Sequence, residues 1–348
     1  MKRYARELVF GLIAVVLIVG YGVLASSAAP FALPAGSPTP TPTKPVSAVQ
    51  APNIPGTIAF ALRGDVYMLR EGKYVSVTSD ARSIQPNLSA DGRTLLFVRA
   101  EAINGKRTVD GQITPAILRY TDIVKKDPGG GTESIVLTGL LVTSPVGFHS
   151  VAWFSGPALS PDAKRFAVTS DAVDGAADLE VFDVQTGKRA SLLSQGSFLA
   201  DPAWSPDGKT IAVTSYTFGE PRLLLVPSDG RPALPLAIKG ATGEAYRPSY
   251  SPDGAWITYT LRSEGRNDLH AVEVKTGRDV ALTNDGRSWN GVFSPDGKQV
   301  AFLRESGGVI DLYAMDVSDA LLGGSVRAAV KLTRGEGIDG DSRPAWGN

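Results

Sequence analysis

Cysteine is absent from the 348 residues, and histidine occurs only at His149 and His270. Without cysteine the chain forms no disulfide and offers no thiolate metal ligand, no cysteine nucleophile and no site for a lipid on cysteine. Two histidines far apart in the sequence are too few for a histidine metal cluster. The sequence therefore predicts no metal site and no cofactor, and it assigns no catalytic residue.

An excess of charge of either sign is also missing, because 35 Lys and Arg balance 35 Asp and Glu. This balance argues against the basic surface of a nucleic-acid-binding protein, so we expect no nucleic-acid partner. The chain holds 38 glycines and 24 prolines, while 43% of its residues are hydrophobic. This composition favours an all-β fold in which many short strands are joined by turns.

The first 29 residues are typical of a membrane anchor. Residues 1–7 are basic, and the 22 residues from 8 to 29 carry no charge. At about 1.5 Å per residue this stretch would span a hydrocarbon layer of roughly 30 Å, and the basic flank places residues 1–7 in the cytoplasm. We expect a transmembrane signal-anchor helix at 8–29. A cleaved secretory signal is the alternative, which Pro30 disfavours.

Residues 30–55 form a Pro/Thr-rich segment with eight prolines. Such a segment cannot donate a continuous ladder of hydrogen bonds, so we expect an extended, solvated linker. At about 3.1 Å per residue it could hold the following domain up to roughly 80 Å from a membrane.

From Gly56 onward a unit of about 45 residues recurs. Its marker is Pro, a variable residue, an aromatic residue and then Ser-Pro-Asp-Gly. The last copy, at residues 344–347, is truncated. The five fuller copies are residues 86–92, 157–163, 202–209, 248–254 and 291–298. The first step between copies is longer than the others, so one unit carries about 25 extra residues.

The marker has the composition of a tight turn between two antiparallel strands. We therefore interpret its repeated aspartates as turn formers rather than as catalytic or metal-binding carboxylates: Asp91, Asp162, Asp207, Asp253 and Asp296. Ala163 stands where the other copies have glycine, so we expect a left-handed backbone there at some energetic cost.

Short alternating segments follow each marker, such as residues 211–213 and 300–302, and a third segment often begins with Asp. Four strands per unit is the composition of a propeller blade. The amino-terminal unit lacks its innermost strand, and the carboxyl end supplies only that strand. We therefore expect a six-bladed β-propeller of four-stranded antiparallel blades over residues 56–348. Residues 343–347 would close the ring by pairing with the 57–78 blade.

The marker and the segments after it resemble the repeat of the TolB-type six-bladed β-propellers, over residues 56–348. The resemblance implies the fold strongly and a function weakly, because propellers of this kind serve unlike functions. It suggests a docking platform in the periplasm or on the cell surface. The α/β domain that precedes the propeller in TolB is not recognised here. A hydrolase domain of the kind some similar propellers carry, and a G-x-S-x-G motif, are also missing, so we expect no enzyme activity.

The residues just before the innermost strands should surround the mouth of the central channel. Six residues there or next to it are our candidates for binding a ligand or partner: Gln85, Asp201, Arg247, Trp289, Asn290 and Arg343. The extra residues should form loops on the same face, at 100–114 and 139–156, where Phe148, Trp153 and Phe154 would add apolar surface. We expect alanine at Arg247 and Arg343 to weaken binding and to leave folding intact.

These features predict a non-enzymatic protein-binding scaffold, tethered to the cytoplasmic membrane by one helix, with its propeller on the extracytoplasmic side. It would act as an accessory subunit of a membrane or envelope complex. The alternative is a module that binds an envelope glycan or another small ligand at the channel mouth.

Overall fold

The computed structural model describes residues 54–171, 177–194, 198–217 and 219–348. The expected anchor helix at 8–29 and nearly all of the linker lie outside these residues. The described residues belong to the second of two compact units, Ala48–Asn348. Their one helix is the single turn α2 (Ser318–Leu321), and no helix among them has the length and apolarity needed to cross a membrane.

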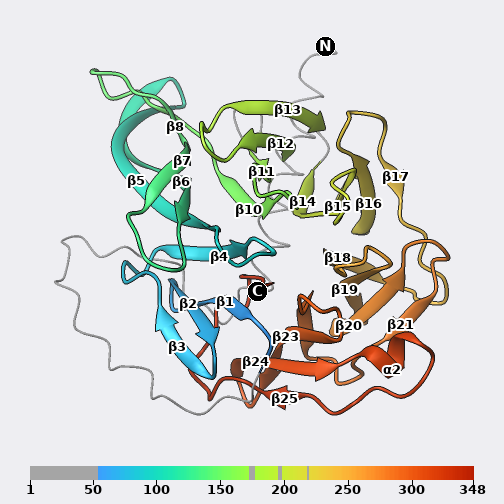
Figure 1. The fold of residues 1–348 in the computed structure, drawn as a ribbon. Coiled ribbons are helices and arrows are strands. Elements are labelled where there is room, and N and C mark those ends of the chain that lie inside the picture. Colours follow the sequence, from blue (N-terminus) through green and yellow to red (C-terminus); the bar gives the residue numbers. More distant parts are fainter. Residues whose placement is uncertain (1–53, 172–176, 195–197, 218) are drawn as a thin grey trace. The chain divides into compact units, whose positions relative to one another are not determined.

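The described residues contain six four-stranded antiparallel sheets, which we call blades 1 to 6 (Figure 1). Blade 1 contains β26 (Ala345–Gly347), β1 (Thr57–Leu62), β2 (Asp65–Arg70) and β3 (Lys73–Ser76). Blade 2 contains β4 (Ser83–Leu88), β5 (Leu95–Val109), β6 (Gln112–Lys126) and β7 (Ser134–Thr138). Blade 3 contains β10 (Phe154–Leu159), β11 (Arg165–Ser170), β12 (Asp178–Asp183) and β13 (Arg189–Ser194).

The remaining blades have the same order of strands. Blade 4 contains β14 (Leu199–Trp204), β15 (Thr210–Ser215), β16 (Arg222–Pro227) and β17 (Leu234–Pro235). Blade 5 contains β18 (Glu244–Tyr250), β19 (Trp256–Ser263), β20 (Arg266–Glu273) and β21 (Asp279–Ala281). Blade 6 contains β22 (Ser288–Phe293), β23 (Gln299–Ser306), β24 (Val309–Asp316) and β25 (Val330–Lys331).

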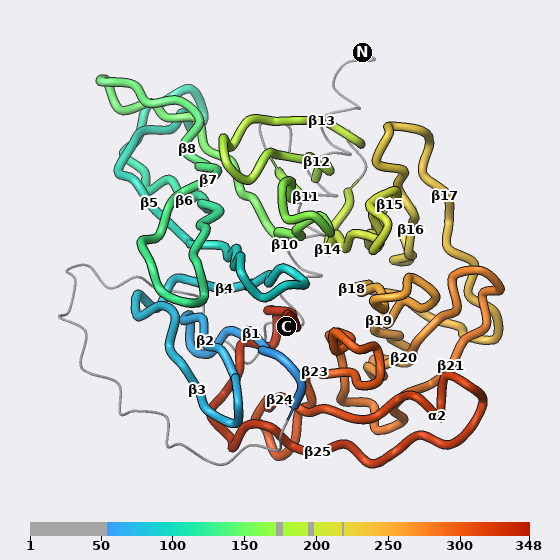
Figure 2. Tube along the Cα trace, in the orientation of Figure 1, coloured from blue at the N-terminus to red at the C-terminus, as the bar shows by residue number. Residues whose placement is uncertain are grey.

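The blades follow one another around a ring. The first strand of each blade contacts the first strand of the next, from β4 through β10, β14 and β18 to β22, and β22 contacts β26 in blade 1. Figure 2 shows the resulting ring of sheets, with the carboxyl end near its centre. The all-β architecture expected from the sequence is therefore present, and it has the arrangement of a propeller.

The ring closes between the two ends of the described chain. Strand β26 pairs antiparallel with β1, so that Ile58 lies opposite Trp346 and Ala59 lies opposite Ala345. The indole Nε1 of Trp346 also donates a hydrogen bond to the carbonyl of Pro55, at 2.6 Å. This is the arrangement that the two complementary partial repeats led us to expect.

Apolar side chains of consecutive blades share common cores. Trp204 of blade 4 packs with Leu179 of blade 3, and Phe293 of blade 6 packs with Trp256 of blade 5. Alternation along the innermost strands places the rings of Trp204 and Phe293 between blades. The stability of each blade therefore depends on its neighbours.

The repeated aspartates form turns, as predicted. In blade 4 the Ser205 hydroxyl donates to Asp207 Oδ1 at 2.7 Å, and the backbone N–H of Lys209 donates to the same oxygen at 3.0 Å. Hydrogen bonding to Ser205 and Lys209 holds the pKa of Asp207 below its ordinary value. Equivalent bonds from the marker serine occur at the other four copies.

The extra residues of blade 2 depart from our expectation. Residues 100–109 are not a loop, because β5 and β6 continue as a paired hairpin to Val109 and Gln112, where Asp110 and Gly111 form the turn. A separate two-stranded sheet, β8 (Leu140–Val142) and β9 (Ser150–Val151), lies in the connection from blade 2 to blade 3. Asp-Gly between alternating segments is a strong hairpin signal that our interpretation of the sequence did not use.

The backbone at Ala163 provides a test of the turn assignment. Its φ is 54°, in the left-handed region, whereas Gly208 at the same place in blade 4 has φ 69°. We expect Ala163→Gly to stabilise the protein by about 1 kcal/mol, because glycine adopts this conformation without strain. Thermal unfolding measures the effect, and Gly208→Ala is the matched control that should lower the melting temperature. An unchanged or lower melting temperature for Ala163→Gly would contradict the assignment.

Candidate functional site

Five equivalent residues surround the centre of the ring, one near the start of the innermost strand in each of blades 2 to 6. All five have positive φ, between 51° and 59°: Gln85, Gly156, Asp201, Arg247 and Asn290. At each of them the register to the second strand shifts, which marks a β-bulge. The bulges turn these residues out of the regular alternation of their strands. We call this region the channel mouth, together with Arg343 at the corresponding place before β26.

A small hollow lies at the channel mouth. Its lining includes four of the six candidate residues, Gln85, Asp201, Arg247 and Arg343, together with Asp341. The hollow has a volume of about 30 Å³, which is room for a water molecule or two. The structure therefore brings these four residues together, in a space smaller than a sugar ring.

Most of the polar groups at the channel mouth hold the segment that leads into β26. The carbonyl oxygen of Gly340 accepts hydrogen bonds from Trp289 Nε1 at 2.9 Å and from Asn290 Nδ2 at 3.2 Å. Arg247 Nη1 donates to the same oxygen at 3.3 Å and to Asn290 Oδ1 at 2.9 Å. Three candidate binding residues thus converge on one backbone oxygen.

Arg343 reaches across the ring to two other blades. Its Nη1 donates to the carbonyl of Pro248 in blade 5 at 2.5 Å, and its Nη2 donates to the carbonyl of Pro202 in blade 4 at 3.0 Å. Burial lowers the pKa of the guanidinium, with the nearby Asp201 opposing this and Arg247 reinforcing it. A planar guanidinium can satisfy two carbonyls at once, which a lysine ammonium does less well.

The same segment is fixed to blades 1 and 2. The Asp339 carboxylate accepts hydrogen bonds from the backbone N–H groups of Arg63 at 3.1 Å and Gly64 at 2.8 Å. Burial raises the pKa of Asp339, although these two bonds oppose the shift. The Ser342 hydroxyl accepts from the backbone N–H of Gln85 at 2.8 Å. We call residues 338–348 the carboxyl-terminal latch.

Trp289 and Asn290 are less accessible than a binding role would suggest. Asn290 is completely buried, and Trp289 is half-buried with its indole N–H committed to the latch. Phe154, which we expected to add apolar surface, is also buried, in the core between blades 2 and 3. Sequence analysis overlooked the latch residues Asp339 and Ser342, although the Asp-Gly-Asp-Ser run before the last marker is a turn signal.

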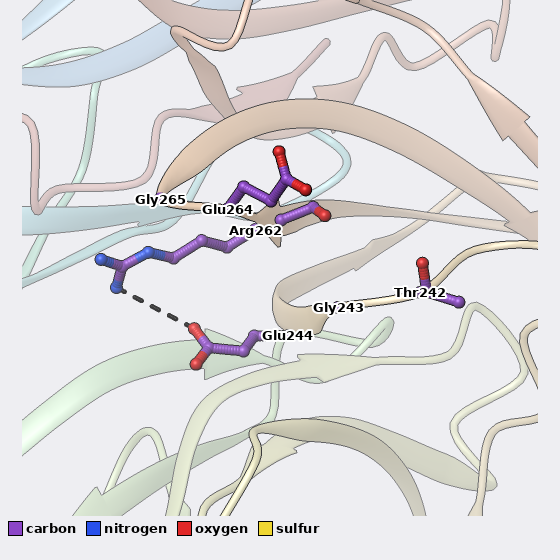
Figure 3. A pocket seen from close by; sticks show the side chains of 7 residues that line it. Thr242, Gly243, Glu244, Arg262, Glu264 and Gly265 are labelled. Carbon is purple, nitrogen blue, oxygen red and sulfur yellow. Dashed lines mark ion pairs between the residues drawn. The ribbon is translucent and has the colours of Figure 1, made fainter.

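A larger groove lies in blade 5, on the side where the chain enters the innermost strand. It has a volume of about 460 Å³ and lies between residues 242–244, at the start of β18, and residues 262–265, at the turn between β19 and β20. Figure 3 shows Arg262 extended toward Glu244, with Nη1 and Oε2 separated by 3.9 Å. The hydroxyl of Tyr246 donates to Glu244 as well. Charged groups and hydroxyls therefore line a groove of ligand size.

Apolar side chains are exposed in the connection from blade 2 to blade 3. Val142 and Val146 are 59% and 62% exposed, and Phe148 and Trp153 are 37% and 40% exposed. Several large apolar side chains exposed in one connection suggest an interaction site. We call these four residues the apolar patch.

Both histidines form hydrogen bonds with neighbouring residues of the fold. His270 is buried, and its Nδ1 lies 2.9 Å from Asp279 Oδ2, while the Tyr259 hydroxyl donates to the other carboxylate oxygen at 2.7 Å. His149 Nδ1 accepts from the backbone N–H of Ser144 at 3.4 Å. Among the described residues, no three His, Asp or Glu side chains are grouped as metal ligands would be.

Six four-stranded blades around a polar mouth define a β-propeller over the described residues. The TolB beta propeller domain matches residues 148–348, and the chain belongs to that family. No curated protein sequence is significantly similar to the chain.

Solved structures show the same fold at low sequence identity. TolB from Acinetobacter baumannii is 21% identical, with a TM-score of 0.61 over 84% of this chain and 66% of its own length. This chain therefore spans just under two thirds of that protein. A putative TolB from Agrobacterium tumefaciens is 19% identical, with a TM-score of 0.61 over 84% of this chain and 92% of its own. An oligogalacturonate lyase in complex with manganese is 15% identical, with a TM-score of 0.51 over 78% of this chain and 70% of its own.

The contacts of Arg343 predict that alanine at this position lowers the stability of the fold, whereas from the sequence we expected alanine to leave folding intact. Arg343→Ala leaves two carbonyls without their charged donor, so we expect it to destabilise the fold by about 2–4 kcal/mol. Urea unfolding measures this loss. Arg231→Ala is the control, because Arg231 is 76% exposed at its side chain and forms its ion pair with Asp229 in its own turn. Equal stability of the two variants would show that Arg343 does not hold the latch.

Proposed function

We propose that this chain is a non-enzymatic scaffold that binds another protein through the face that carries the channel mouth. The apolar patch is the observation that carries the proposal. It lies in the connection between the outermost strand of blade 2 and the innermost strand of blade 3, and such connections are on the mouth face. A rigid ring beside exposed aromatic and aliphatic side chains suits protein recognition.

The residues of the channel mouth are arranged to hold the latch rather than to carry out chemistry. Its arginines, asparagine and tryptophan hold the latch, so they are not free to act as acid, base or nucleophile without opening the ring. The hollow between them holds a water molecule or two and is too small for an organic substrate. Family membership agrees with an interaction scaffold, although some propellers of similar fold belong to enzymes.

We further propose the location and the attachment. Residues 8–29 form the membrane anchor, residues 30–55 are the linker, and the propeller lies on the extracytoplasmic side. The support is the 22-residue uncharged stretch and its basic flank. In this arrangement the partner belongs to a membrane or envelope complex.

A photo-crosslinking amino acid at Phe148 of the full chain tests the docking face. We expect irradiation of intact membranes to give one adduct of fixed mass, because Phe148 would lie against the partner. Leu234, which is 64% exposed on the outermost strand of blade 4, is the control position and should give none. Failure to form an adduct at Phe148, together with recovery of a lone monomer after mild solubilisation, would contradict the proposal.

The groove in blade 5 favours a second candidate function, the binding of a glycan or another small polar ligand. With about 460 Å³ and with Arg262, Glu244 and hydroxyl groups in its lining, it offers the donors and acceptors that sugar hydroxyls need. The sequence suggested the channel mouth for this ligand, but the groove has the space that the hollow at the mouth lacks.

Thermal shifts with envelope oligosaccharides test this second candidate. We expect a raised melting temperature with a binding sugar, since a ligand of the native state stabilises it by mass action. The Arg262→Ala variant should lose the shift while its melting temperature without sugar changes little, because the pair with Glu244 is long and partly exposed. A shift that persists in the variant would exclude the groove.

A further inference from the structure

The part of the β5–β6 hairpin beyond residue 101 is an arm with two different faces. Its residues alternate between two faces: one is partly covered over most of its length but exposed near the tip, and the other, which we call the outer face, is exposed at every position. The outer face consists of Ala102, Asn104, Lys106 and Thr108 on β5 with Ile113, Pro115, Ile117 and Arg119 on β6.

The outer face exposes apolar side chains to solvent, where polar side chains are usual. Ile113 and Ile117 are 61% and 65% exposed, with Pro115 between them on the same face of β6. In a half-covered hairpin the apolar residues ordinarily occupy the covered face. Here Gly105 of the covered face lies against Leu118 and His149, so the isoleucines of the outer face contribute nothing to that packing.

Both edges of the arm are unsuited to a strand from a partner protein. The backbone N–H of Lys106 on the β5 edge already donates to the carbonyl of Gly147, at 2.7 Å. On the β6 edge Pro115 has no N–H to donate, a common protection of an edge strand. Neither hollow described above lies on the arm. The outer face is therefore the surface of the arm that we consider for a partner.

The charges of the outer face identify the chemistry of the occupant. Its charged residues, Lys106 and Arg119, are both cationic, whereas Glu101 is on the covered face and Asp110 is in the turn at the tip. Exposed apolar surface beside cations complements the acyl boundary and the anionic head groups of a membrane. The acidic tip means that the arm would lie along the surface instead of inserting end-on.

We propose that the outer face of the β5–β6 arm rests on an anionic lipid surface. This contact is additional to the proposed anchor, and the linker gives the propeller enough reach for it. It would hold the propeller in one orientation, whereas a linker alone leaves it free to rotate. The chemistry involved is burial of the two isoleucines and attraction of Lys106 to lipid phosphates.

The absence of cysteine makes a direct test possible, because one introduced cysteine is labelled uniquely. Thr108→Cys in the full chain carries an environment-sensitive fluorophore on the outer face without removing an isoleucine. Leu234→Cys, on the outermost strand of blade 4, is the control label. Both chains are reconstituted with vesicles of phosphatidylcholine, with or without one-third phosphatidylglycerol. We expect a blue shift and quenching by nitroxide lipids at position 108 only, and only with phosphatidylglycerol.

Substitutions separate the apolar and the charged contributions. Ile113→Ser combined with Ile117→Ser should abolish the shift, whereas Leu322→Ser combined with Val330→Ser, at other exposed positions, should preserve it. Lys106→Gln should reduce the ratio of bound to free arm about fivefold.

Vesicle flotation distinguishes the arm from the anchor. A chain that floats while its label at 108 remains solvent-exposed overturns the arm proposal and leaves the anchor intact. A shift of equal size in vesicles of phosphatidylcholine alone overturns the role of anionic lipid. A shift that needs a second protein overturns the lipid proposal in favour of a protein partner. A chain that does not float at all contradicts both the arm and the anchor.

Discussion

The carboxyl-terminal latch is the constraint on which the rest of the structure depends. Its strand β26 completes blade 1, and its side chains and backbone make hydrogen bonds to blades 1, 2, 4, 5 and 6. Without this last strand, β1 would lie at an unpaired innermost edge of blade 1. Because consecutive blades share their apolar cores, opening at this one place would weaken packing around the ring.

The latch also decides where recognition can occur. Polar residues that point toward the centre of a propeller are natural candidates for a binding site, yet here Arg247, Asn290 and Arg343 satisfy backbone carbonyls and one another. What remains for a ligand or partner lies around the mouth: the groove of blade 5, the apolar patch and the arm. The centre is thus structural and the periphery of the same face is available for binding.

The blades and their turns could be predicted from the sequence because the same pattern of turn residues and alternating strands recurs in each repeat. The marker serines and aspartates form the expected turns, and the alternation after them forms the expected strands. Equivalent positions before the innermost strands could be located at the mouth for the same reason. Their roles could not, because the three donors on the Gly340 carbonyl come from positions 50 to 93 residues away in the sequence. The arm was missed because residues 100–114 were assigned to a loop before the Asp110-Gly111 turn signal was considered.

Native-state hydrogen exchange of the two paired ends tests the latch most directly. If the latch closes the ring, the N–H groups in the β1–β26 ladder, around Ile58 and Trp346, will exchange only through global unfolding. Their free energies of exchange will then equal the free energy of unfolding measured with denaturant. Exchange at these amides with a much smaller free energy, while the amides of β15 and β19 stay protected, would show that the ring opens there independently and would contradict the account.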